Sequence, residues 1–471
     1  METVKEIRQN QDMKMMLRTV LVIALCFLLT STGWLSWEYH LLVQMPADRV
    51  DLYTMVAGYL LQAAGIGLFA FLAGRKKNIE RSVLRLALVM HMLFMFPAVV
   101  SPYPAATLIF GFLMNLACGV IAGCYLYELA KYAPAARRAT SFGIAYAASI
   151  LGSWLLSVID GGRLYYSEKV LLICVFITAA VFALTFMERY SESDTESESE
   201  EEPISRNSKA PDHKLILAAA LIVILFSTVN GSAFGFPAAD LGSSVKVELS
   251  RLFYAAGLMI AGFVSDRSRK TGAICALTAL MIPFVIMSLR AESISVVIFW
   301  ALGYFTFGFY AVYRIILFSD MASEYRLLWM SGLGLMAGRI GDAAGEVICL
   351  LLKDRLAVLV TVTAVLFVAA VSVFFRIYQM LYLPAYKKER SKEEYFAAFT
   401  AEHDLSSREQ DMLKLLLEKK SNDEIAEELF ISENTVKFHI HNLLQKTGCK
   451  NRNELISYYS VYFTDEKLES L

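Results

Sequence analysis

Three ionisable residues, Arg339, Asp342 and Glu346, lie within a segment that is otherwise apolar. In a helix with 3.6 residues per turn, positions three and seven residues apart share one face, so these side chains would be neighbours. An ionised group at bilayer depth is costly unless it is paired or hydrated, which makes it a candidate for function. Arg339 could bind an anionic group, and the two acids could bind a cation or a proton. Alternatively, Arg339 and Asp342 neutralise each other within the helix and serve packing.

Arg314 lies in the preceding apolar segment, 293–318, about one helical turn before its end. From there its side chain could reach the aqueous surface, or it could belong to the same ligand-binding cluster. Small residues in the segment that holds Arg339 would let a neighbouring helix approach closely. These are Gly332, Gly334, Gly338, Gly341 and Gly345.

A second group of candidates lies in the polar C-terminal tail, 402–471. Ser421 with Glu424 three residues later, and Ser432 ahead of an apolar stripe, are the start signals of two short helices. Two helices joined by so short a turn are typical of a helix-turn-helix, in which the second helix enters the major groove of DNA. The candidate DNA-binding residues are the cap and the exposed face of that second helix: Ser432, Asn434, Thr435, Lys437, Phe438, His441 and Lys446.

The tail resembles the LuxR-type helix-turn-helix domain over 405–459. The matching segments are 405–409, 421–426, 431–439, Lys446 and 451–455. The resemblance implies a four-helix fold and binding to double-stranded promoter DNA. It further implies that Thr435 and Lys446 contact phosphates, and that Lys437, Phe438 and His441 face the edges of the bases.

The local charge of the tail agrees with DNA binding. The stretch 434–453 holds four basic residues and no acid, whereas the stretch before it is acidic. Because so small a basic patch gives weak binding on its own, we expect a homodimer on DNA, with Tyr458 and Tyr459 of the fourth helix at its contact. Lys419 stands where the family often has glycine, so we expect strain at that corner.

The rest of the chain explains its unusual composition. Of the 471 residues 56% are hydrophobic and only 19% are charged, whereas a soluble domain carries about 25% charged residues. The sequence predicts twelve membrane-spanning helices, each about 20 residues long, and therefore an all-α fold. The segments are 15–37, 52–73, 83–100, 105–129, 141–159, 168–187, 214–236, 250–266, 271–289, 293–318, 327–352 and 355–381.

Basic residues predict the orientation of these helices. Lys and Arg are frequent in the N-terminal tail, in alternate loops and after the last span, and cytoplasmic loops carry such an excess. Both termini are therefore expected in the cytoplasm, with the chain as a multi-pass protein of the bacterial inner membrane. The tail would then lie in the compartment that holds DNA.

Six spans, a polar linker and six more spans resemble the layout of the major facilitator superfamily. The loop 262–270 supports this resemblance, because Gly262, Asp266, Arg267 and Lys270 follow that family's loop signature. Gly262 would allow close helix approach, and Asp266 would cap a helix start or pair with an arginine of the facing helix. The predicted parts are an N-terminal tail 1–14, membrane halves 15–187 and 214–383, a linker 188–213, a connector 384–401 and the DNA-binding domain 402–471.

The linker contains the acidic run 191–202, which has seven acids and no base. Such runs repel themselves and stay disordered. It could be a solubilising hinge between the halves, or it could regulate the protein through contact with basic loops or phosphorylation of its serines.

We therefore expect a membrane-embedded transcription regulator whose bundle senses a small ligand and controls the tail. An active transporter with a regulatory DNA-binding tail is the alternative. An enzyme is not expected, because no phosphate loop or nucleophile–base set occurs. No cofactor or metal site is expected either, since the seven cysteines form no metal-binding spacing. The expected partners are promoter DNA, an unidentified small ligand, the lipid bilayer and a second copy of the chain.

Overall fold

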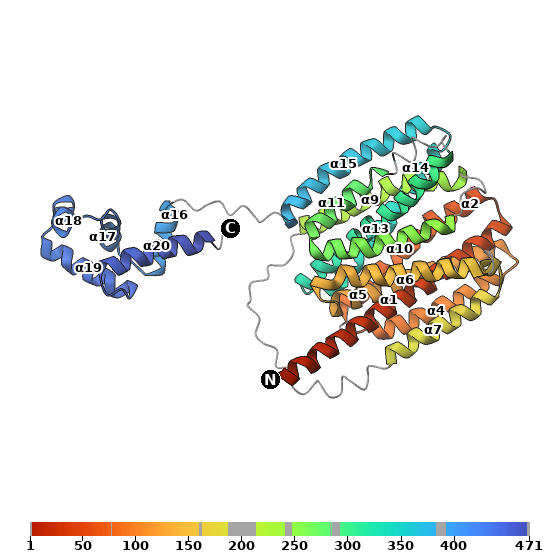
Figure 1. Cartoon of the computed structure of the whole chain (residues 1–471), viewed down its shortest axis with the longest axis horizontal. Helices are drawn as coiled ribbons and strands as arrows, with labels where there is room; N and C mark the ends of the chain where they lie inside the picture. The colour runs from red at the N-terminus through yellow and green to blue at the C-terminus, as the bar shows by residue number, and fades with distance from the viewer. Residues whose placement is uncertain are drawn as a thin grey trace. The chain divides into compact units, whose positions relative to one another are not determined.

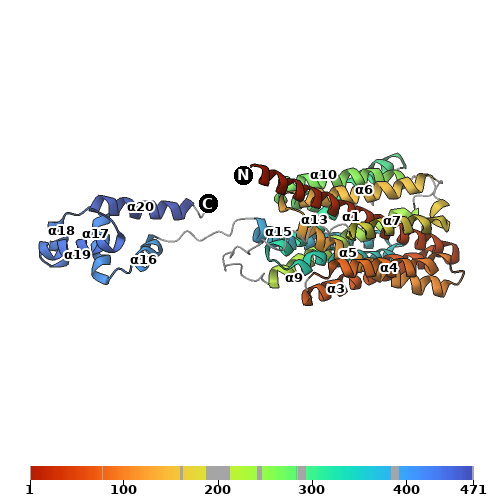
Figure 2. The same cartoon turned by 90° about the horizontal axis from the view of Figure 1, so that it is seen from below.

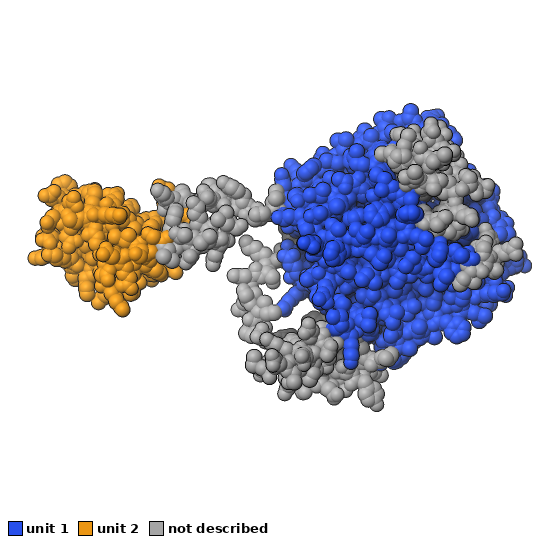
Figure 3. Space-filling model, in the orientation of Figure 1, with its two compact units in different colours: residues 1–382 blue, residues 383–471 orange. Residues whose placement is uncertain are grey.

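The computed structural model describes residues 2–76, 78–159, 163–186, 213–240, 247–282, 284, 293–382 and 392–468. The chain divides into two compact units, 1–382 and 383–471 (Figure 3). All regular elements in the described ranges are helices, which confirms the predicted all-α class. The acidic run 191–202 and the start of the predicted connector, 384–391, lie outside the described residues.

The larger unit is a bundle of long helices that run side by side (Figures 1 and 2). Before the linker these are α1 (Glu2–Gln44), α2 (Ala47–Asp51), a π-helical segment (Leu52–Gly58), α3 (Tyr59–Arg75), α4 (Glu80–Val100), α5 (Pro104–Tyr132), α6 (Arg138–Ile159) and α7 (Lys169–Phe186). After it come α9 (His213–Asp240), α10 (Val247–Arg267), α11 (Arg269–Ala279), α13 (Ser293–Glu324), α14 (Leu333–Leu352) and α15 (Leu356–Tyr382). Short 3-10 helices are Ala135–Arg137, Arg163–Tyr166 and Leu328–Gly332.

Nine helices within the described ranges are long and apolar enough to cross a membrane. They correspond to nine of the twelve predicted spans, and the segments without such a helix are those of α10, α11 and α14. In α14 the reason is chemical, since Arg339, Asp342 and Glu346 lie within 20 residues. The chain is thus a multi-pass membrane protein, whereas the count of twelve and the division into six plus six remain predictions.

The outer surface of the bundle is apolar. Phe176 is 73% exposed and Leu351 is 76% exposed, as expected where lipid replaces water as the solvent. Inside, glycines allow backbones to touch. A Cβ atom at Gly345 of α14 would lie 2.6 Å from the Thr228 carbonyl oxygen of α9, which confirms the predicted close approach of a neighbouring helix at this position.

The smaller unit contains α16 (Lys392–Glu402), α17 (Ser407–Leu417), α18 (Asn422–Leu429), α19 (Glu433–Thr447) and α20 (Arg452–Leu468). The last four are the helices predicted from the sequence. The first adds a fifth helix in the segment predicted as a connector, and its Phe399 is fully buried in the core of this unit. Part of the connector is therefore an integral part of the domain.

Candidate functional site

The second helix of the helix-turn-helix, α19, begins and ends at the predicted signals. The Ser432 hydroxyl accepts a hydrogen bond from the Thr435 backbone amide at 3.2 Å, so Ser432 is the N-cap. Gly448 ends the helix in the left-handed region, at φ 69°. The preceding helix α18 starts with a capping box, in which Ser421 and Glu424 satisfy each other's backbone amides.

Burial of one face of α19 determines which of its side chains are exposed to solvent. Val436 and Leu443 are fully buried against α17 and α18, in the core that also holds Ile425. The side chains left outside are those predicted to contact DNA, with Phe438 61% exposed. Exposed residues of this face are Asn434, Lys437, Phe438 and His441, while Thr435 is half-buried and its hydroxyl hydrogen-bonds to that of Ser432.

Lys437 pairs with Glu433 one turn earlier, with 2.5 Å between ammonium and carboxylate. Its hydrogen bond to Glu433 raises the pKa of Lys437 above its usual value. Both side chains are about half exposed, so the pair is weak. The Lys437 ammonium is therefore charged at neutral pH, and its contact with DNA stays a prediction.

Lys446 is engaged within the domain. Its ammonium lies 2.7 Å from the Glu409 carboxylate and 2.8 Å from the Asp404 carbonyl oxygen. Burial alone would raise the pKa of Glu409, but hydrogen bonds from Lys446 and from Ser406 outweigh it and hold that pKa below its usual value. The predicted phosphate contact of Lys446 stays a prediction. In the structure this residue ties the end of α19 to the start of α17.

Three turns of the tail use the left-handed conformation without glycine, at Asp404, Lys419 and Phe430. Lys419 has φ 63°, which confirms the predicted strain at that corner, and Phe430 has φ 51° between α18 and α19. The Phe430 side chain is 94% exposed, which the sequence interpretation did not single out.

The residues predicted at the dimer contact lie partly inside the domain. The ring of Tyr459 packs 6.4 Å from that of Phe396 and 5.0 Å from that of Phe399, both in α16. Tyr458 contacts Phe399 and His403 but keeps 38% of its surface exposed. Of the two tyrosines, Tyr458 is therefore the one more available to a second chain.

In the membrane unit, Asp342 lies between two arginines. Its carboxylate is 3.1 Å from Arg314 of α13 and 3.8 Å from Arg339 of its own helix. The structure thus brings together three of the four predicted ligand-binding residues. Glu346 is buried one turn further along α14, and it forms no ion pair with the described part of the chain.

The position predicted for Arg314 was wrong. Helix α13 continues to Glu324, so Arg314 lies ten residues before its end, and its side chain is 5% exposed. It cannot reach the aqueous surface. The helix continues because the polar residues after 318 lie on a helix end packed against its neighbours, where Ser319 is buried and Asp320 is ion-paired.

Two tyrosines contact the charge cluster formed by Arg314, Arg339 and Asp342. The Arg339 guanidinium stacks 4.3 Å above the ring of Tyr59, which lies in α3. The Tyr310 hydroxyl accepts a hydrogen bond from Arg314 at 3.3 Å. The sequence interpretation missed both tyrosines. Tyr310 could have been found four residues before Arg314 on one helix face, whereas nothing in the sequence points to Tyr59.

The loop signature 262–270 forms a second polar cluster, between α6 and α10. The Asp266 carboxylate accepts hydrogen bonds from the backbone amides of Ala139 and Thr140 at 3.0 and 2.7 Å, and from Arg269 at 2.8 Å. Asp266 therefore caps the start of α6, as one of its two predicted roles required. Its arginine partner is Arg269, three residues later in the chain, and not an arginine of the facing helix. A Cβ atom at Gly262 would lie 2.6 Å from the Ala139 carbonyl oxygen, so the predicted close approach is also confirmed.

The smaller unit is similar in sequence to known bacterial regulatory proteins. Residues 403–459 match the family model described as bacterial regulatory proteins, luxR family. The spore germination protein GerE of Bacillus subtilis (strain 168) is 48% identical over 52 residues, which are 11% of this chain and 70% of that protein. The CsgBAC operon transcriptional regulatory protein of Escherichia coli (strain K12) is 50% identical over 54 residues, 12% of this chain. The chain spans only 25% of the length of that second relative.

The larger unit resembles a solved membrane transporter. The crystal structure of the human organic anion transporter MFSD10 (TETRAN) superimposes with a TM-score of 0.57 at 15% sequence identity, over 77% of this chain and 99% of that one. A likeness at this identity shows the fold alone.

A helix-turn-helix domain joined to a major-facilitator-like membrane bundle defines a membrane-bound DNA-binding protein. The chain belongs to the LuxR family of bacterial regulatory proteins through its C-terminal domain. Its relatives are regulators of transcription rather than enzymes.

Proposed function

We propose that this chain is a membrane-embedded transcription regulator, in which binding of a small ligand to the bundle controls how the tail binds promoter DNA. The observation that carries the proposal is a LuxR-family helix-turn-helix domain in the same chain as a bundle with buried charges. The class of regulator follows from the family, and ligand control is our inference.

The charge of the cluster supports a ligand with an anionic group. Arg314 and Arg339 share one acid, Asp342, so the three side chains carry a net positive charge. A buried excess charge is costly unless a further partner neutralises it. Arg339 is 20% exposed, the most accessible of the three, and would be the first to contact the ligand.

A ligand can shift the protein only if it binds two states with different affinity. Arg339 of α14 contacts Tyr59 of α3, so the cluster joins helices from both sides of the linker. A ligand that replaced Tyr59 as the partner of Arg339 would favour a different packing of these helices. Movement of α15, the last helix of the bundle, would then reach the tail.

The tail would act on DNA in the cytoplasm of a bacterium, with the bundle in the inner membrane and both termini inside. Asn434, Lys437, Phe438 and His441 would face the bases from α19, with Ser432 and Thr435 at its start near the phosphates and Lys446 at its end. A homodimer formed through Tyr458 would add the affinity that one small basic face lacks.

Chromatin immunoprecipitation of the tagged full-length chain tests this function. Enriched sites are expected near a small set of promoters, and they should be lost in a Lys437→Ala, His441→Ala variant that still reaches the membrane. If wild-type protein enriched no site under any growth condition, the regulator proposal would be wrong.

The alternative is an active transporter with a DNA-binding tail, and the transporter-like fold favours it. Counterflow of labelled organic anions into vesicles distinguishes the two functions. Robust counterflow that Arg339→Gln abolishes would establish transport, and its absence from vesicles holding correctly folded protein would leave sensing as the role of the bundle.

A further inference from the structure

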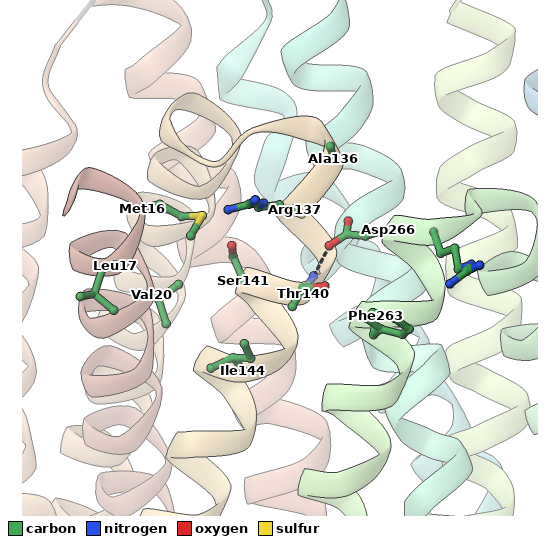
Figure 4. Close-up of a pocket in the computed structure, with 11 residues that line it drawn as sticks. Met16, Leu17, Val20, Ala136, Arg137, Thr140, Ser141, Ile144, Phe263 and Asp266 are labelled. Atoms are coloured by element: carbon green, nitrogen blue, oxygen red, sulfur yellow. Dashed lines mark hydrogen bonds between the residues drawn. The ribbon is translucent and has the colours of Figure 1, made fainter. Parts of the chain in front are cut away.

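A groove of about 500 Å³ lies at one end of the bundle, away from the charge cluster of α14. Its walls come from α1, from the 3-10 helix Ala135–Arg137 with the start of α6, and from the end of α10 (Figure 4). Its volume is within the range of small-molecule sites. The lining residues include Leu17, Val20, Arg137, Ile144, Phe263 and Arg267.

Apart from its basic end, the groove is lined by apolar side chains and opens to the outside of the bundle. Leu17 is 66% exposed, Ile144 is 46% exposed and Phe263 is 61% exposed. On a membrane-spanning bundle these exposed surfaces face lipid. Val20 lies about one turn beyond Met16 in α1, on the side that faces Ile144 of α6 (Figure 4).

The end of the groove is basic. Arg137 and Arg267 are both exposed, and neither side chain has an ion pair or hydrogen bond with the described residues. Figure 4 shows Arg137 extending towards Met16 of α1, above the apolar part. Asp266, the acid that lines the groove, has Arg269 as its counter-charge and accepts hydrogen bonds from the backbone amides of Ala139 and Thr140, so it forms no pair with either of the two arginines.

We propose that this groove binds one anionic glycerophospholipid. Its phosphate lies at the basic end of the groove, which Arg137 and Arg267 line, and one acyl chain follows Leu17, Val20 and Phe263. A slot that is apolar along its length and basic at its aqueous end has the chemistry of such a lipid, and basic pockets between membrane helices bind anionic headgroups. This site goes beyond the proposed function, because it needs neither DNA nor the ligand of the charge cluster.

The position of the groove gives the lipid a structural role. It joins α1 and α6, which precede the linker, to α10, which follows it. The Asp266–Thr140 hydrogen bond of 2.7 Å joins the same two helices, α6 and α10, at the groove's edge. The bound lipid therefore favours the state in which the start of α6 and the end of α10 are held together.

Native mass spectrometry of the purified full-length protein tests the site, with phosphatidylglycerol or phosphatidylcholine added in detergent. Wild type is expected to retain one phosphatidylglycerol in preference to phosphatidylcholine. Arg137→Gln with Arg267→Gln should weaken this binding about 30-fold, since each basic group near an anionic lipid contributes about 1 kcal/mol. The matched control, Arg75→Gln with Lys76→Gln, removes two exposed charges outside the groove and should bind as wild type.

Two further variants separate a lipid from a free phosphate. Val20→Phe fills the apolar slot and keeps both arginines, so it should lose phosphatidylglycerol. Arg137→Lys with Arg267→Lys keeps the charge and should restore most of the binding. Equal retention of both lipids by wild type, equal loss in the control, or competition by glycerol 3-phosphate that Val20→Phe does not change would overturn the proposal.

Discussion

Arg314 of α13 and Asp342 of α14 form a buried ion pair, with 3.1 Å between guanidinium nitrogen and carboxylate oxygen. A glycine makes room for it, since a Cβ atom at Gly338 would lie 2.9 Å from the same guanidinium nitrogen. The charge of α14 is thus balanced mainly from another helix, and the pair within α14, at 3.8 Å, is the longer contact.

Removal of the shared acid should destabilise the bundle. Asp342→Asn leaves Arg314 and Arg339 without a counter-charge, and breaking a buried pair in this way costs about 3–5 kcal/mol. Thermal unfolding of the purified full-length protein in detergent measures the loss. The control is Asp354→Asn, at an exposed position beyond α14. An unfolding temperature equal to that of the control would show that Asp342 does not hold the bundle together.

The stability lost when a glycine is replaced by alanine should depend on which atoms the new Cβ would meet. Gly345→Ala would bring a Cβ atom to 2.6 Å from a backbone oxygen of α9, and that backbone cannot move aside as a flexible side chain would. Overpacking of this kind costs about 1–3 kcal/mol. Gly74→Ala is the matched control, because its Cβ atom would meet Trp329 at an ordinary 3.8 Å. The same unfolding measurement should separate them, and equal temperatures would contradict the close contact of α9 and α14.

The tail was predictable because its signals are local. The boxes at Ser406 and Ser421, the cap at Ser432 and the stop at Gly448 each depend on residues within four positions. Such signals act before tertiary structure forms. Helix α16 was missed because it has weak local signals, and its Phe399 is buried only once α20 is in place.

The membrane cluster was predictable in part. The sequence placed Arg339 and Asp342 on one face, which needs only the helical repeat. It could not show that Arg314 faces Asp342, because that depends on which helices are neighbours and on where α13 ends. For the same reason Tyr59, far away in the chain, was not expected beside Arg339.

Substitution on the outer face of α19 should weaken DNA binding without unfolding the tail. Lys437→Ala with His441→Ala removes exposed groups that take no part in the core, and affinity for an immunoprecipitated promoter duplex should fall at least tenfold. Lys414→Ala, an exposed lysine of α17, is the control. Fluorescence anisotropy at several salt concentrations measures both. Unchanged affinity in the double variant would exclude this face as the DNA-binding surface.

Relief of backbone strain should stabilise the tail. Lys419 has φ 63°, where a side chain costs about 1 kcal/mol or more and glycine costs little. Lys419→Gly should therefore raise the free energy of unfolding of a 392–471 fragment by about 1 kcal/mol, measured by urea denaturation. Glu418→Gly is the control, since Glu418 has φ −76° and gains nothing from glycine. Destabilisation by Lys419→Gly would mean that the lysine side chain contributes more than the strain costs.

The Glu409–Lys446 pair should make the stability of the tail fall in acid. The pKa of Glu409 is lower in the folded domain than its usual value, so its stabilising effect is complete above the pKa of the unfolded chain, about 4.3. It is lost as the pH falls through the lower pKa of the folded state, when the carboxylate is protonated. Thermal unfolding of the 392–471 fragment between pH 7 and pH 3, followed by circular dichroism, measures this loss.

Glu409→Gln should lower stability at pH 7 and make the remaining pH dependence shallower, because the glutamine does not titrate. Glu427→Gln, at an exposed position of α18, is the matched control and should keep the wild-type slope. The same slope in Glu409→Gln and wild type would show that this carboxylate does not link the start of α17 to the end of α19. Weaker DNA binding by Glu409→Gln at pH 7 would follow from the same link, because the end of α19 would lose the contact that holds Lys446 against the start of α17.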